Sequence, residues 1–330
     1  MPHTVHVASV LVACVSVGLA AVAVVTMPAC GADDPSVAPV ADAGSGDGGS
    51  SGIGFGDSGT GTPADAGGAC IAPDMLITLD RTQSMHFTPD GVDPANTPAG
   101  HAMSKWAMAI EGVKQLTAAP LDQGVRFGLE LWPKAVTGCI SLAERIDGGQ
   151  ATNTQCLEGE VVVDTDVGSG AKITKLLDPD TTPICISTPT GSALLTASAY
   201  LSAHKADGAK QFVVLVTDGA DWALSCPDPD PLVVVDQLKT AGVTTMIVGF
   251  SAEASLQGGV GAAFLNDMAC AGGASKNFPA GCGKNADGAY RALDPDAGPS
   301  GTLFYVATNP TELATNVQAL AKTVCCGCVK

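Results

Sequence analysis

The sequence predicts an α/β fold in which helices flank an open, mostly parallel β-sheet. Strand-like apolar runs alternate along the chain with amphipathic segments, an order typical of such sheets. The runs "QFVVLVT" and "VTTMIVGF" are also continuously apolar, as expected for parallel strands that are covered on both faces. The expected strands are 75–79, 125–131, 212–216, 244–250 and 303–307, and the expected helices are 103–118, 191–205, 231–242 and 309–324.

The first expected helix, 103–118, shows the pattern most clearly. Its apolar residues Trp106, Ile110, Val113 and Leu116 recur at three- and four-residue spacing, which places them on one face of a helix. This face should pack on the sheet.

Two segments, 133–168 and 252–300, fit this alternation poorly. We expect the first to form a loop or hairpin excursion, and the second to begin with a short helix around "AAFLNDMA". The first contains Cys139 and Cys156, and the second contains Cys270 and Cys282. Disulfides would pin such excursions by limiting the freedom of the unfolded chain, and we expect the pairing to lie within each excursion.

The N-terminal segment has the composition of an export signal. The first 29 residues contain no Asp, Glu, Lys or Arg and are mostly apolar, so they form either a signal sequence or an uncleaved membrane helix. The "MPAC" stretch resembles a bacterial lipobox, although Pro28 is unusual there. We therefore expect 1–29 to be a lipoprotein signal peptide, with Cys30 lipidated. Residues 30–72 are rich in Gly, Ser, Ala and Asp and should form a disordered tether to the folded part, 73–330.

Charge and cysteine content narrow the class of protein further. The formal net charge of -17 argues against nucleic acid or an anionic membrane surface as a partner, so the membrane would be reached through the lipid anchor only. Of the 12 cysteines, Cys14 lies in the leader and Cys30 is the lipidation candidate. The other cysteines are even in number, and in an oxidising compartment this predicts that they form disulfides. The expected location is the cell envelope, at the outer membrane or the cell surface.

Carboxylates and hydroxyls follow the expected strands. Asp80, Thr82 and Ser84 come after strand 75–79, Asp218 follows strand 212–216, and Thr188 and Thr190 precede helix 191–205. Ligands of parallel α/β sheets bind at the carboxyl ends of the strands. Any one of these residues could simply cap a loop or helix. Together they supply oxygen ligands only, which suits a hard divalent cation such as Mg²⁺.

The stretches "LITLDRTQSM", "VRFGLELWP", "STPTGSALL", "FVVLVTDGADW" and "VTTMIVGF" resemble, in this order, a von Willebrand factor type A domain over residues 73–324. The resemblance implies a Rossmann-like sheet and a metal-ion-dependent adhesion site. It implies Mg²⁺, or else Mn²⁺ or Ca²⁺, as the ion and Asp80, Thr82, Ser84, Thr188 and Asp218 as its ligands, with Thr190 the less suitable threonine. Thr82 stands where Ser is usual. The implied partner is a protein or extracellular matrix ligand that offers a carboxylate, and the implied protein is not an enzyme.

Other interpretations remain open. The chain could be a structural envelope protein with an unused metal site, in which Asp221 and Trp222 either belong to a binding rim or cover a sheet edge. It could also be a metal-dependent hydrolase, but His86, beside the first motif, is expected to be solvated, and no Walker A motif is present. The terminal Cys325 and Cys328 form a Cys-x-x-Cys after the end of an expected helix, which favours disulfides over redox or zinc chemistry.

Overall fold

The computed structural model describes residues 71–95, 97–146, 149–153, 157–219, 229–250, 260–295 and 301–324. Its strands are β1 (Asp74–Asp80), β2 (Arg126–Trp132), β3 (Glu160–Asp166), β4 (Gln211–Thr217), β5 (Val243–Phe250), β6 (Cys282–Lys284), β7 (Tyr290–Ala292) and β8 (Tyr305–Ala307). Its helices are η1 (Gln83–His86), α1 (Pro98–His101), α2 (Lys105–Leu116), α3 (Leu121–Gly124), α4 (Leu142–Ile146), α5 (Gly170–Leu176), α6 (Thr190–Ala203), α7 (Pro231–Thr240), α9 (Val260–Gly272) and α10 (Pro310–Val324).

The described strands form a six-stranded sheet in the order β3-β2-β1-β4-β5-β8, and β6 and β7 form a separate hairpin. The pairs β1–β2, β1–β4, β4–β5 and β5–β8 are parallel, and β3 is antiparallel to β2. The α/β class with a mostly parallel sheet is therefore confirmed. The five predicted strands correspond to β1, β2, β4, β5 and β8.

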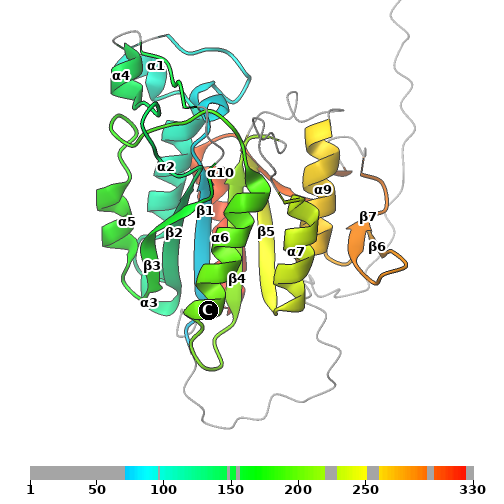
Figure 1. The fold of residues 1–330 in the computed structure, drawn as a ribbon. Coiled ribbons are helices and arrows are strands. Elements are labelled where there is room, and N and C mark those ends of the chain that lie inside the picture. Colours follow the sequence, from blue (N-terminus) through cyan, green and yellow to red (C-terminus); the bar gives the residue numbers. More distant parts are fainter. Residues whose placement is uncertain are drawn as a thin grey trace, which may run out of the picture. The chain divides into compact units, whose positions relative to one another are not determined.

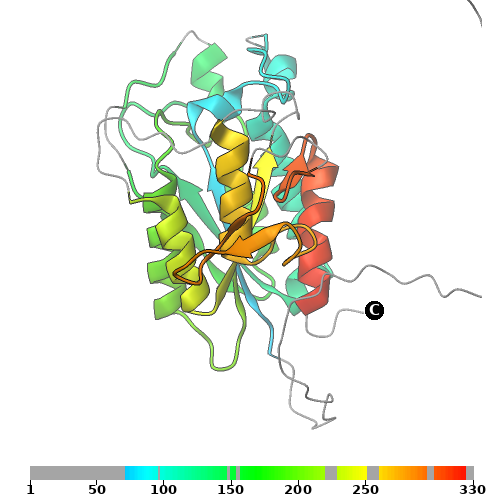
Figure 2. The ribbon, with the colours of Figure 1, turned by 90° about the vertical axis from the view of Figure 1, so that its right-hand side faces the viewer.

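Helices cover both faces of the sheet (Figure 1). Because side chains alternate along a strand, Met75, Ile77 and Leu79 of β1 face one layer and Leu76 faces the other. The first layer contains α2, α5 and α10, and the second contains α6, α7 and α9. Figure 2 shows α7 and α10 on opposite sides of the sheet. Burial on both faces explains the continuous apolar runs of β4 and β5.

Helix α2 illustrates how local sequence sets an element. The hydroxyl of its N-cap residue Ser104 accepts a hydrogen bond from the backbone N–H of Ala107 at 3.1 Å. Trp106, Ile110 and Val113 are buried as predicted, in the core shared with α10. The close approach of α10 requires Gly112, where a Cβ would lie 2.7 Å from Cδ2 of Leu313.

The segment 133–168 is more regular than the predicted loop or hairpin excursion. It contains α4 and the edge strand β3, whose Val163 and Thr165 turn inward while Asp164 and Asp166 are exposed. This alternation is the pattern of a half-buried strand. Its pairing with β2 has register irregularities near Leu129, so β3 is a distorted edge.

The predicted disulfide pairing is half right. Cys270 pairs with Cys282 within the second excursion, as expected. Cys139, however, pairs with Cys185, outside the first excursion and just before α6. The reason is spatial, because Ile140 and Ile184 form an antiparallel bridge that brings the two segments together. Cys156 lies outside the described residues.

No described helix combines the length and the apolarity that crossing a bilayer requires. The predicted signal peptide, the lipidated Cys30 and the tether lie outside the described residues.

Candidate metal centre

The site lies where the strand order reverses. From β1 the sheet grows through β2 in one direction and through β4 in the other, so the carboxyl ends of β1 and β4 flank a topological switch point. Register places Leu79 beside Val216, so Asp80 and Asp218 leave the sheet next to each other. The parallel topology thereby joins two motifs that are distant in sequence.

Four of the predicted ligands form one chain of hydrogen bonds. The hydroxyls of Thr82 and Ser84 are 2.8 Å apart, and Ser84 Oγ donates to Asp218 Oδ1 at 2.8 Å. The backbone N–H of Thr82 donates to Asp80 Oδ1 at 2.7 Å, which folds the turn after β1 onto its own carboxylate. The structure thus brings Asp80, Thr82, Ser84 and Asp218 together.

Asp80 is the deepest member of this group. Its side chain is buried, and its Oδ2 accepts a hydrogen bond from Thr217 Oγ1 at 2.7 Å. Burial raises the pKa of Asp80 to about 7, and the nearby charge of Asp218 raises it as well, against the lowering effect of Thr217 and Thr82. Removal from water and a neighbouring carboxylate both make the Asp80 anion costly unless a cation is close.

Thr188, the fifth predicted ligand, lies on the loop that precedes α6. This loop pairs with the turn after β1, because Cys185 N donates to Arg81 O at 3.0 Å and Gln83 N donates to Cys185 O at 2.7 Å. Thr188 is buried, and Ser187 before it has a φ of 85°, an uncommon conformation for a residue with a side chain.

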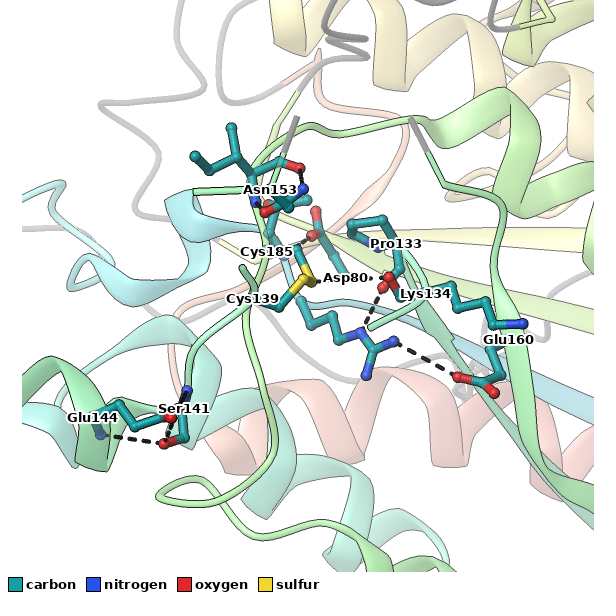
Figure 3. The surroundings of a disulfide bond; sticks show 12 residues. Asp80, Pro133, Lys134, Cys139, Ser141, Glu144, Asn153, Glu160 and Cys185 are labelled. Atoms are coloured by element: carbon teal, nitrogen blue, oxygen red, sulfur yellow. Dashed lines mark hydrogen bonds and ion pairs between the residues drawn. A yellow bond between two sulfur atoms is a disulfide. The ribbon is translucent and has the colours of Figure 1, made fainter. Parts of the chain in front are cut away.

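Two further contacts hold the loop before α6 in place (Figure 3). The disulfide joins Cys185 to Cys139, and the side chain of Asn153 bonds to both the N–H and the carbonyl of Ile186, at 2.7 and 2.9 Å. In the part of the chain that is described, the carbonyl of Thr188 accepts from Thr190, and no hydrogen bond joins the Thr188 side chain to the other four residues. The loop of Thr188 is therefore held beside the turn after β1, but the threonine is not part of the hydrogen-bonded chain.

The donor set fits a hard divalent cation. It consists of hydroxyl and carboxylate oxygens, and within the described ranges no group of three or more His, Cys, Asp or Glu residues is placed to hold a metal. The buried pair of carboxylates favours a positive charge at this point. Thr82, Ser84, Asp80 and Asp218 are the residues that would hold the ion.

Lys105 and Thr217 belong to the site but were not predicted from sequence. Lys105 Nζ donates to Asp218 Oδ2, and both side chains are almost fully buried. The signal for Lys105 lies in where the helix starts. The expected helix begins at 103, but a start at Lys105, as in the structure, sets its positive charge against the helix dipole, so that it needs an anion nearby. Thr217 has no such signal, since a threonine at the end of an apolar strand has many possible roles.

The expectation that His86 is solvated is wrong. His86 is buried, and its Nε2 lies 3.0 Å from Asp93 Oδ1, which also contacts Arg145. Burial is the main cause that lowers the pKa of His86 to about 4, with Arg145 adding to it, so the ring is neutral near pH 7. Asp221, Trp222, Cys325 and Cys328 lie outside the described residues.

Comparison with known proteins adds a family match. Residues 173–282 match the family model of the von Willebrand factor type A domain, and this range includes Thr188 and Asp218 but not Asp80, Thr82 or Ser84. No curated protein matches the sequence.

Several solved structures are distantly similar. Proximal thread matrix protein 1 from the mussel byssus is 14% identical, over 77% of this chain and 46% of that one, with a TM-score of 0.41. BatB from Bacteroides thetaiotaomicron is 11% identical, over 76% of this chain and 100% of that one, with a TM-score of 0.38. The pilus adhesin SpaC from Lactobacillus rhamnosus GG is 16% identical, over 77% and 31%, with a TM-score of 0.42. Likenesses of this size carry no information about activity.

The family match and the sheet topology agree. The matched residues run from α5 to the start of β6 and contain β4 and β5, two central parallel strands. The chain therefore contains a von Willebrand factor type A region, which confirms the resemblance indicated by its motifs.

Proposed function

We propose that this protein binds a protein or extracellular matrix ligand through a divalent cation held at the carboxyl ends of β1 and β4. The observation that carries the proposal is the hydrogen-bonded chain of Asp80, Thr82, Ser84 and Asp218, which gathers two carboxylates and two hydroxyls at the switch point of the sheet. Thr188, on the adjacent loop, is the proposed fifth ligand.

The chemistry of the site follows from its oxygen donors. A bound Mg²⁺, Mn²⁺ or Ca²⁺ would supply a positive centre with a position open to a carboxylate of the partner, which lets an acidic protein bind an acidic ligand. Asp80 and Asp218 supply the compensating charge, and Thr82 and Ser84 orient neutral oxygens toward the same point. The backbone pairing of Arg81 and Gln83 with Cys185 keeps the turn after β1 and the Thr188 loop together.

The proposed setting is the cell envelope. Residues 1–29 are the proposed lipoprotein signal peptide, Cys30 the lipidated residue, and 30–72 the tether that carries the folded domain to its ligand. An anchor of this kind would be the only contact with the membrane.

Thermal unfolding of the complete, oxidised chain in mild detergent tests the metal site. Melting is followed with EDTA and with Mg²⁺, Mn²⁺ or Ca²⁺, for wild type, Asp80→Asn and the control Asp164→Asn, which removes a charge from the exposed side of β3. An ion at about 100 times its dissociation constant stabilises the folded state by about 2.7 kcal/mol. For a domain of this size, this corresponds to a rise in melting temperature of roughly 5–10 °C.

The expected result is a rise in wild type and Asp164→Asn that Asp80→Asn lacks. Equal melting temperatures with EDTA and with millimolar ion in all three proteins would contradict the metal site. The second candidate function, an envelope scaffold with an unused site, would then be preferred. One observation favours it, namely the ammonium of Lys105 that already contacts Asp218.

A hydrolase is the weaker alternative. His86, the histidine beside the first motif, is neutral and occupied by Asp93, so it is not placed to act as a base at the cluster. Turnover of generic phosphate or ester substrates that is lost in Asp80→Asn would revive this interpretation.

A further inference from the structure

Lys105 is a buried cation directly at the candidate metal centre. The residue is 6% exposed, and its ammonium donates to Asp218 Oδ2. Lysine is rarely buried to this extent unless it is paired. In the described segments, Lys105 is the one basic side chain that forms an ion pair with either Asp80 or Asp218.

The neighbouring basic residue does not share this role. Arg81 follows Asp80 in sequence, but its Nε donates to the carbonyl of Pro133 at 2.6 Å, and its Nη2 lies 4.0 Å from Glu160 Oε2 (Figure 3). The guanidinium of Arg81 therefore contacts the residue after β2 and the first residue of β3. Among the described side chains, Lys105 alone therefore offsets the negative charge of Asp80 and Asp218.

The position of Lys105 also has a cost in the helix that carries it. As the first residue of α2, it places a positive charge at the positive end of the helix dipole. An exposed lysine there would be mildly unfavourable, and a buried one depends on Asp218. The ion pair with Asp218 therefore offsets both the burial of the ammonium and its unfavourable place in the helix.

Both oxygens of Asp218 are occupied. Oδ1 accepts from Ser84 and Oδ2 accepts from Lys105. A carboxylate oxygen can accept more than one contact, but a divalent ion bound to Asp218 would stand close to the ammonium of Lys105, a like charge, in a poorly solvated place. The ammonium and the ion therefore compete for the same carboxylate.

We propose that Lys105 is a built-in counter-ion that sets the metal affinity of the site by competing for Asp218, and that binding of a divalent cation moves the ammonium off this carboxylate. The proposal rests on the metal site of the proposed function. In the ion-free protein, Lys105 already compensates the charge of Asp218. The ion must therefore be present at a concentration sufficient to replace the lysine.

Titration of the complete, oxidised chain with Mn²⁺, followed by the electron paramagnetic resonance of the free ion, tests this. The variants are Lys105→Met, which keeps the length of the side chain but removes its charge, and Asp80→Asn. The matched control is Lys114→Met, which removes the same charge from the other end of α2, where no ion pair is described. We expect the dissociation constant of Lys105→Met to be at least tenfold lower than those of wild type and Lys114→Met.

The outcomes separate the two proposals. Binding by wild type with no tightening in Lys105→Met overturns the role of Lys105 and leaves the metal site standing. Binding by Lys105→Met alone supports the role in its strongest form, in which the lysine replaces the ion. Absence of binding in both, at tens of millimolar Mn²⁺, overturns the metal site and the role of Lys105 with it.

A second measurement on the wild type does not depend on a variant that folds. Reductive methylation of lysines, read by peptide mass spectrometry, reports how accessible each ammonium is. In protein saturated with Mg²⁺, methylation of Lys105 should accelerate severalfold relative to protein in EDTA, while methylation of Lys114 stays constant. An unchanged rate at Lys105 in the metal-loaded protein would show that the ammonium stays on Asp218, against the proposal.

Discussion

Removing the disulfide between Cys139 and Cys185 tests how the loop before α6 is held. The two cysteines are 46 residues apart, and the loop-entropy relation for a loop of this size gives a stabilisation of about 4 kcal/mol at 25 °C. The second disulfide, Cys270–Cys282, closes a separation of 12 residues, and the same relation gives about 3 kcal/mol. Replacing each pair by alanine should therefore destabilise the protein by different amounts.

The two disulfides should differ most in how their removal affects the candidate metal site. Cys185 pairs with the turn that follows Asp80 and lies three residues before Thr188, whereas Cys270 lies in α9 and Cys282 begins β6. The double variant Cys139→Ala/Cys185→Ala should lose most of the ion-dependent stabilisation of the wild type. The variant Cys270→Ala/Cys282→Ala should keep it.

The assay is urea unfolding with EDTA and with saturating Mg²⁺, for both double variants and wild type. The free energies without ion give the cost of each disulfide, and the differences between the two conditions give the effect of the ion. Equal ion-dependent stabilisation in the two variants would refute the view that the disulfide at Cys185 positions the site. A larger cost for the shorter loop would refute the entropic estimate.

Three further predictions concern buried contacts. Burial raises the pKa of Glu130 well above 4.5, so the unfolded chain ionises first and the wild type loses stability as the pH rises above 4.5. Glu130→Gln should remove this loss, so the difference in unfolding free energy between variant and wild type should grow with pH, by at most about 1.4 kcal/mol per pH unit. A difference that stays constant with pH in urea titrations would contradict this. Gly112→Ala should destabilise the folded protein by about 1–3 kcal/mol because the added Cβ would meet Leu313. If the variant were instead stabilised, as is usual for this change in an exposed helix, α10 would have to be able to move away. Thr217→Val removes a hydrogen-bond donor to Asp80, whose folded pKa of about 7 exceeds its unfolded value of 3.8. Without ion, the loss of unfolding free energy should be about 2 kcal/mol at pH 8, where Asp80 is ionised, and about 1 kcal/mol at pH 5. An equal loss at both pH values would contradict a charged acceptor.

The parallel core could be predicted from sequence because its signals are local. β4 and β5 each contain a continuous apolar run, as expected for strands that are covered on both faces. Once these strands were recognised, their parallel arrangement placed Asp80 and Asp218 at the same edge of the sheet, and the strand order of the structure makes them neighbours. The candidate ligands could thus be named from sequence and resemblance, whereas the contacts that join four of them come from the structure.

The remaining features depend on contacts that sequence does not display. Cys139 could pair with several cysteines, and the choice of Cys185 is set by a bridge between Ile140 and Ile184. Whether Lys105 points to solvent or into the site depends on how α2 starts, which the helical period leaves open. The segment of β3 was predicted to be a loop or hairpin excursion because its second half, Asp164 to Asp166, is polar throughout, and burial of Thr165 shows only in the structure.

The two borders of the main sheet are protected in different ways. In the described part of the chain, one border is β8, only three residues long, and the other is β3, which exposes Asp164 and Asp166. A short strand offers little backbone for pairing, and acidic side chains on both copies would repel each other. Many copies of this domain at high local concentration would thus resist joining their sheets into fibrils and would remain separate molecules.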